Sequence, residues 1–102
     1  MQISIKTITQ SEQRYDTTDD WQIAENGDIT MYVSEGTQIE VQREIIHGLT
    51  ECFLCIKHGI TQKEVDDYDM SHLESDNPGE NEDAPYHKEH IAANIAEHIL
   101  DL

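Results

Sequence analysis

One segment of the sequence places a histidine and a carboxylate four residues apart, a spacing that aligns two side chains on one side of a helix. The pair is His47 and Glu51, and an imidazole and a carboxylate in this arrangement can bind a single metal ion. Glu44 and His58 would lie on the same side. That side is opposite an apolar stripe, so a polar face in solvent is the competing interpretation. The stripe consists of Ile45, Leu49, Phe53 and Ile56.

A second set of metal-ligand types recurs toward the end of the chain. On a helix it would form one stripe, made of Asp83, His87, His90, Asn94 and His98. The competing interpretation is a polar helix edge whose last histidine favours the helix dipole. If the two helices pack side by side, His47 and Glu51 meet His90. His87 or Asp83 would then be a fourth donor or would hydrogen-bond one of the ligands. Mixed histidine and carboxylate donors suit zinc, and less exclusively iron, manganese or nickel.

Other chemistry has weaker support in the sequence. Glu44 and His47 have the spacing of a di-iron bundle, but such a site needs a second pair of this kind, which the chain lacks. Cys52 and Cys55 have no second cysteine pair with which to bind zinc, and core packing is the better interpretation for them. No phosphate-binding glycine loop and no Gly-x-Ser-x-Gly nucleophile elbow is present.

Hydrophobic periodicity indicates which elements position these residues. Near-alternation at 3–8 predicts a first strand, and 21–25 and 28–33 flank an Asn26-Gly27 pair. Asn-Gly between alternating segments is a strong hairpin signal because both turn positions need a positive φ. We therefore expect a small, mostly antiparallel sheet of about three strands.

From about Ile39 the apolar residues repeat with helical spacing, and Gly59 is a plausible stop for this helix. Thr61 predicts the N-cap of a second helix over about 62–73. A third helix is expected to begin at Ala84-Pro85, with Asp83 as its N-cap and a buried stripe of isoleucines. That stripe consists of Ile91, Ile95 and Ile99. The prediction is an α+β fold in a single domain over 1–102, with a β-rich part at 1–36 and a helical part at 37–102.

The charge of the chain limits its partners. Among 102 residues there are 22 Asp and Glu against 6 Lys and Arg, a formal net charge of −16. Direct contact with nucleic acid or an anionic membrane is not expected, because phosphate binding requires basic side chains. A metal ion or a basic host protein remains open as a partner. The carboxylates concentrate in an acidic helix and loop segment at 64–83, which contains no Lys or Arg.

The sequence shows neither an apolar run of membrane-spanning length nor the pattern of a secretory signal, and two reduced cysteines suit a cytoplasmic location. The charge alone supports a second hypothesis, an acidic inhibitor without enzymatic activity that occupies a host defence or nucleic-acid-binding protein. Such inhibitors include the anti-restriction, anti-CRISPR and DNA-mimic types. A structural or adaptor domain is the third possibility.

Most of the chain resembles small proteins of phages and prophages, a family without an established activity. Those proteins show a His-Glu-x-x-Glu helix and a later Ala-Pro-Tyr-x-x-x-His segment. The resemblance is carried by 3–8, 11–15, 47–55, 59–69, 78–79 and 83–90. It implies a location in the host cytoplasm if the protein is encoded by a phage.

The resemblance also implies a minimal zincin-like arrangement, in which one helix offers His47 and Glu51 and a later helix offers His90. Gly48 stands where the family pattern has a glutamate. In zincin metallopeptidases that glutamate is the general base acting on the zinc-bound water. We therefore expect a zinc-binding protein without full peptidase activity. Glu44, on the same helix face, is the candidate to replace the missing base.

Overall fold

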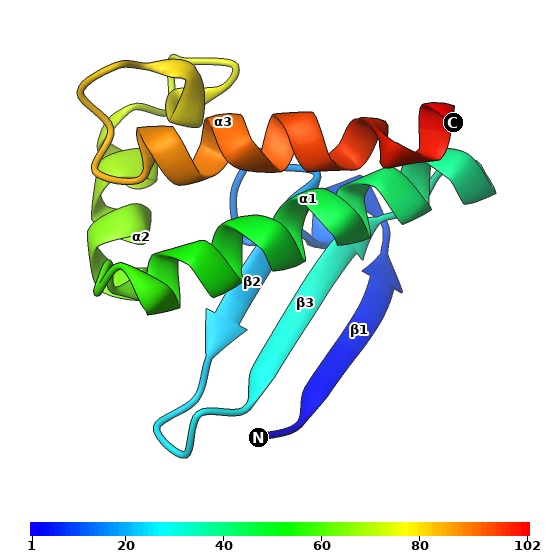
Figure 1. The fold of residues 1–102 in the computed structure, drawn as a ribbon, viewed down its shortest axis with the longest axis horizontal. Coiled ribbons are helices and arrows are strands. Elements are labelled where there is room, and N and C mark those ends of the chain that lie inside the picture. Colours follow the sequence, from blue (N-terminus) through cyan, green and yellow to red (C-terminus); the bar gives the residue numbers. More distant parts are fainter.

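Three strands form one mixed sheet with the most apolar strand at its centre (Figure 1). The computed structural model describes residues 1–102. Strands β1 (Ile3–Ile8), β2 (Asp19–Ile23) and β3 (Ile29–Ser34) lie in the order β1-β3-β2. Strand β3 runs antiparallel to β2 and parallel to β1. The α+β fold with three strands is confirmed, and the sheet is mixed because β3 inserts between β1 and β2 and buries its apolar face there.

The hairpin predicted at Asn26-Gly27 connects β2 to β3, with a different turn geometry from the one expected. The Gly27 N–H donates to the Ala24 carbonyl at 2.9 Å, and the Ala24 N–H donates to the Asp28 carbonyl at 2.8 Å. Gly27 has a φ of 89°, whereas Asn26 keeps a negative φ. Only the glycine therefore needs left-handed backbone, as in hairpins whose turn is followed by a glycine bulge.

Helix α1 (Gln38–Lys57) is the longest element and crosses one face of the sheet. Its N-terminus is capped by Thr37, whose side chain accepts from the Glu40 N–H while Glu40 reaches back to Thr37. It ends before Gly59, which has a φ of 73°, as the glycine stop predicts. Gly48 faces the sheet so closely that a Cβ there would lie 2.4 Å from Met31 Cε. A larger residue at position 48 would require the end of this core methionine side chain to shift.

Helix α2 (Gln62–Ser71) begins as predicted, with the Thr61 side chain accepting from the Glu64 N–H. A short 3₁₀ helix, η2 (Pro78–Glu80), precedes α3 (His87–Ala96), and a final 3₁₀ turn, η3 (Glu97–Asp101), extends it. The prediction that Asp83 caps α3 is wrong. Its carboxylate accepts from the Tyr68 hydroxyl at 2.6 Å instead, and α3 begins after Tyr86 without a side-chain cap.

Helix α3 lies alongside α1, on the side of α1 away from β1 (Figure 1). The isoleucine stripe expected to be buried is not, because Ile95 and Ile99 are 71% and 59% exposed. The buried side of α3 carries Glu89, His90 and Ala93. The polar side of α1 faces this surface, and His47 and Glu51 are buried there. None of the helices combines the length and the apolar character that a membrane crossing requires.

Candidate metal centre

Three of the residues singled out by sequence meet between α1 and α3. His90 Nδ1 lies 2.8 Å from Glu51 Oε2, and His47 Nε2 lies 3.5 Å from the same oxygen. One donor atom from each residue lies within 4.8 Å of the others. Two ligands of a tetrahedral zinc site with bonds near 2.1 Å are separated by about 3.4 Å. The group therefore has the size and the chemistry of a three-ligand metal site.

The second ring nitrogen of each histidine contacts a further carboxylate. The His47 Nδ1 lies 3.4 Å from Glu97 Oε1, and the His90 Nε2 lies 3.3 Å from Glu80 Oε1. Asn94 holds Glu80 in turn, because its amide donates to Glu80 Oε1 at 2.7 Å. Metal-ligating histidines characteristically donate their other N–H to a carboxylate, which fixes the tautomer and makes the ligating nitrogen more basic. Both histidines here have such a partner.

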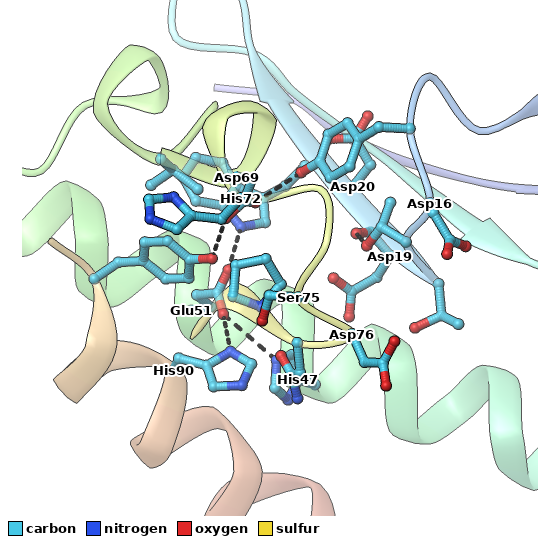
Figure 2. Close-up of a pocket in the computed structure, with 18 of the residues that line it drawn as sticks. Asp16, Asp19, Asp20, His47, Glu51, Asp69, His72, Ser75, Asp76 and His90 are labelled. Atoms are coloured by element: carbon cyan, nitrogen blue, oxygen red, sulfur yellow. Dashed lines mark hydrogen bonds and ion pairs between the residues drawn. The ribbon is translucent and has the colours of Figure 1, made fainter. Parts of the chain in front are cut away.

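Glu51 is oriented by the sheet. The Trp21 indole Nε1–H donates to Glu51 Oε1 at 3.1 Å, and both side chains are buried. This bond satisfies one carboxylate oxygen and leaves Oε2 directed at the two histidines (Figure 2). Strand β2 thus fixes the orientation of a candidate ligand that α1 carries.

The three residues perturb one another electrostatically. Burial opposes ionisation of Glu51, but hydrogen bonds from His47 and His90 outweigh it and lower its pKa to about 2. Burial likewise disfavours the charged form of His47, while Glu51, Glu97 and Glu44 favour it and leave its pKa raised. A carboxylate that stays ionised thus attracts a cation to the histidines, either a proton or a metal ion.

The turn at η2 closes the site over His90. Gly79 is buried against the imidazole, and a Cβ at this position would lie 2.5 Å from His90 Cγ. The Gly79 carbonyl also accepts from His87 Nδ1 at 2.9 Å, provided that this nitrogen carries the proton. Only glycine allows the backbone to approach the ring so closely, so this turn helps to fix the orientation of His90.

The triad opens into a pocket of about 290 Å³ bounded by the start of β2, by α1 and α3, and by the segment after α2 (Figure 2). Asp19, Asp69 and Asp76 are among the residues that line it. Asp69 accepts hydrogen bonds from the Tyr15 hydroxyl at 2.9 Å and from the Tyr86 hydroxyl. If the triad held a metal ion, three protein donors beside an accessible cavity would leave a coordination position for water or a substrate, as in catalytic metal sites.

The other predicted ligands lie outside the converging group. Asp83 binds Tyr68, and His87 is turned to the Gly79 carbonyl. Glu44 lines the pocket and accepts from the Thr18 hydroxyl at 3.1 Å, but it does not converge with the histidines. Cys52 and Cys55 are fully buried in the hydrophobic core. Burial raises the pKa of the Cys52 thiol to about 12, so it remains protonated.

Sequence reasoning missed Trp21, Gly79, Glu80 and Glu97 as parts of the site. Glu97 follows His90 by seven residues, a spacing of about two helical turns, so the helical pattern could have indicated it. No comparable signal marks Glu80 or Trp21, because tertiary contacts alone bring η2 and β2 to the site.

The whole chain was compared with models of protein families, with curated proteins and with solved structures, and none of the three comparisons gives a match.

Proposed function

We propose that this protein binds one divalent metal ion, natively zinc, through His47, Glu51 and His90 in a zincin-like arrangement. The observation that carries the proposal is the two-sided hydrogen bonding of the histidines. One nitrogen of each is directed at Glu51 and the other at Glu97 or Glu80. A carboxylate at the nitrogen that faces away from the shared ligand is the arrangement that metal-ligating histidines characteristically have.

The proposed metal site lacks the water-activating carboxylate of zincin peptidases. Gly48 follows the first proposed ligand, and a Cβ there would force the terminal methyl of Met31 to shift. The metal would polarise a bound water or a substrate oxygen as a Lewis acid. Without the helix glutamate, hydrolysis by the usual zincin route is not expected. The function that the pocket supports is metal-dependent ligand binding, with peptidase activity reduced or lost.

The acidic inhibitor predicted from charge has less support from the structure. Three carboxylates of the acidic segment at 64–83 line the pocket instead of contributing to an outer acidic surface. They are Asp66, Asp69 and Asp76. Their position is better explained by a cation held inside the pocket than by imitation of a phosphate backbone.

The proposal is tested by titrating chelator-treated protein with zinc, in competition with a chromophoric chelator. We expect one ion per chain for the native protein, and at least a hundredfold weaker binding for His47→Ala and His90→Ala. His58→Ala is the matched control, because His58 caps the C-terminal end of the same helix, is half-exposed and pairs with Glu89. Folded native protein that takes up no zinc, or equal affinities in all four proteins, would contradict the proposal.

A further inference from the structure

Strand β1 forms an edge of the sheet that no other part of the chain covers. In the order β1-β3-β2 it pairs with β3 alone, and Figure 1 shows no element beyond its outer edge. The outer edge of β2, in contrast, meets α2, where the Gln62 side chain accepts from the Ile23 N–H at 2.6 Å. Strand β2 also carries Asp19 and Asp20. A covering element and charged residues protect an edge strand against pairing with another chain, and β1 has neither a cover nor a carboxylate.

The one charged residue of β1 does not protect this edge. The Lys6 ammonium lies 5.9 Å from the centre of the Tyr32 ring, so the side chain leans over β3 and away from the outer edge. The chain contains 22 Asp and Glu, and none of them belongs to β1. A second copy of this acidic chain can therefore approach β1 without bringing carboxylates of the two strands together.

The side of α1 that is nearer to β1 lacks carboxylates as well. Three glutamates of α1 fall within about 40° of one another around the helix, on the side that faces α3. They are Glu40, Glu44 and Glu51. Phe53 and Ile56 are exposed and lie about 140–160° around the helix from Glu51, toward β1. Exposed apolar side chains thus border the part of the sheet that has no negative charge.

Strand β1 adds exposed apolar side chains on the helix-covered face of the sheet. Ile3 pairs in register with Ile29 and Ile5 with Met31, and residues paired in this way share one face. Ile29 and Met31 are buried in the core, whereas Ile3 and Ile5 are 38% and 43% exposed. The difference arises because α1 packs against β2 and β3, leaving β1 outside its cover. Burial of these two isoleucines would require an additional layer or strand beside β1.

The backbone groups on the outer edge of β1 have no partner in the chain. The Gln2 and Ile8 carbonyls accept hydrogen bonds from β3 and from the residue after it, at 2.9 and 2.7 Å. Consecutive residues of a strand direct their backbone groups to opposite edges. The N–H and C=O groups of Ile3, Ile5 and Thr7 therefore point outward, as a row of alternating donors and acceptors.

This row is complementary to itself when two copies run antiparallel. With Ile5 of one copy opposite Ile5 of the other, Ile3 lies opposite Thr7 and every outward group is bonded. The Ile5 side chains then meet at the two-fold axis on the helix-covered face. On the other face Ser4 lies opposite Lys6, so no like charges face each other. Such a contact uses the same strand of both copies and closes after two.

We propose that two copies of this chain associate through antiparallel pairing of their β1 strands, with Ile5 at the two-fold axis. The inference is independent of the proposed metal site, because the pocket borders β2, at the other side of the sheet. Long-range repulsion between two chains of net charge −16 opposes the contact, and salt screens this repulsion. The dimer should therefore become more stable with added salt, whereas a complex with a basic protein should become weaker.

The test is sedimentation equilibrium of the full chain from micromolar to millimolar concentration, at low and at physiological salt. Ile5→Lys places two like charges beside the axis. Ile95→Lys makes the same exchange at an exposed position of α3 and is the matched control. Thr7→Pro is a second variant, since it removes an outward N–H that β3 does not use, and proline is tolerated at such positions of edge strands.

Amide hydrogen exchange of the native protein locates the contact. The Ser4 and Lys6 N–H groups point to β3 and should be protected at every concentration. The Ile5 N–H points outward, so it should be protected in the dimer and should exchange rapidly after dilution to the monomer. A contact through another surface would leave this amide unprotected at all concentrations.

We expect a concentration-dependent dimer for the native protein and for Ile95→Lys. Association should be at least about tenfold weaker for Ile5→Lys and for Thr7→Pro, with folding checked by circular dichroism. Native protein that stays monomeric at millimolar concentration would overturn the proposal. A dimer that both folded variants retain, or one in which the Ile5 amide exchanges rapidly, would also overturn it. Zinc stoichiometry is measured separately and does not enter this result.

Discussion

His90 Nδ1 lies 2.8 Å from Glu51 Oε2, and this contact joins α3 to α1 within the buried interior. The two residues are 39 positions apart in the sequence. Glu51 also binds the Trp21 indole of β2 and lies beside His47 on its own helix. One carboxylate therefore connects the sheet and both long helices. The metal site that we propose is part of the same packing that holds the fold together.

The carboxylates behind the histidines should tune metal affinity. Glu97→Gln and Glu80→Gln each replace an ionised acceptor by a neutral amide without removing a ligand. We expect zinc affinity to fall about 10- to 100-fold for each, since outer partners of this kind have effects of that size. Glu80 is nearly half-exposed, so its effect should lie at the lower end. Glu82→Gln, in the same loop and exposed, is the control, and an equal loss in the control would contradict this role.

Gly79 should be required for the orientation of His90. In Gly79→Ala the new Cβ would overlap the imidazole ring, and either the ring or η2 must move. We expect zinc binding at least tenfold weaker and unfolding easier by about 1–3 kcal/mol. The matched change is Gly36→Ala, whose Cβ meets only ordinary contacts with Glu40. If both alanine variants bind zinc equally well, the close approach of η2 to His90 is not needed.

The metal-free protein should be most stable between about pH 4.5 and 6.5. The pKa of Glu51 is lowered from 4.5 to about 2, so its stabilising contribution is present above pH 4.5 and is lost as the pH falls. The pKa of His47 is raised from 6.5, so its contribution is present below pH 6.5 and is lost as the pH rises through the folded value. Urea unfolding across pH, for native protein and His47→Gln, measures the difference.

The stability difference between the native protein and His47→Gln should be largest near pH 5.5 and should shrink at alkaline pH. A difference that stays constant from pH 5 to 9 would show that His47 contributes by packing alone. Zinc should counteract the alkaline loss, because the metal replaces the proton on the histidines.

Arg14 should stabilise the fold by neutralising the wall of the pocket. It makes two bonds to Asp20, at 2.7 and 2.8 Å, and two to Asp66 in α2. Asp20 is buried, so Arg14→Ala leaves a buried charge without its cation. Arg14 is itself partly exposed, which reduces the expected cost to about 2–3 kcal/mol. Lys63→Ala, which breaks an exposed pair with Asp67, should leave the midpoint of the same urea titration nearly unchanged.

Local signals in the sequence predict the helices and the three residues of the proposed metal site, because each depends on spacing within one element. Thr61 caps α2, Gly59 follows α1, and the spacing of His47 and Glu51 aligns them. The arrangement of elements is less accessible. Helical periodicity favours the isoleucines of α3 as its buried side, yet the smaller Ala93 permits the close packing that buries His90. Exposed Ile95 and Ile99 are the result.

The strand order and the carboxylates that contact the two histidines could not be predicted for a related reason. β3 becomes central because Ile29, Met31 and Val33 are buried by both neighbours and α1, a tertiary effect that short-range alternation does not encode. Glu80 reaches His90 from a loop without periodicity. The contact depends on Gly79, whose effect becomes visible only once the imidazole is placed against it.

Zinc X-ray absorption spectroscopy on the stoichiometrically loaded protein tests the central claim most directly, when native protein, Glu51→Gln and His58→Ala are compared. The account predicts two imidazole nitrogens and carboxylate or water oxygens at about 2.0–2.2 Å, with no sulfur. Glu51→Gln should lose the ion or change its coordination, and His58→Ala should reproduce the native spectrum. Sulfur at about 2.3 Å, a shell without imidazole, or a spectrum unchanged by Glu51→Gln would contradict a metal site at His47, Glu51 and His90.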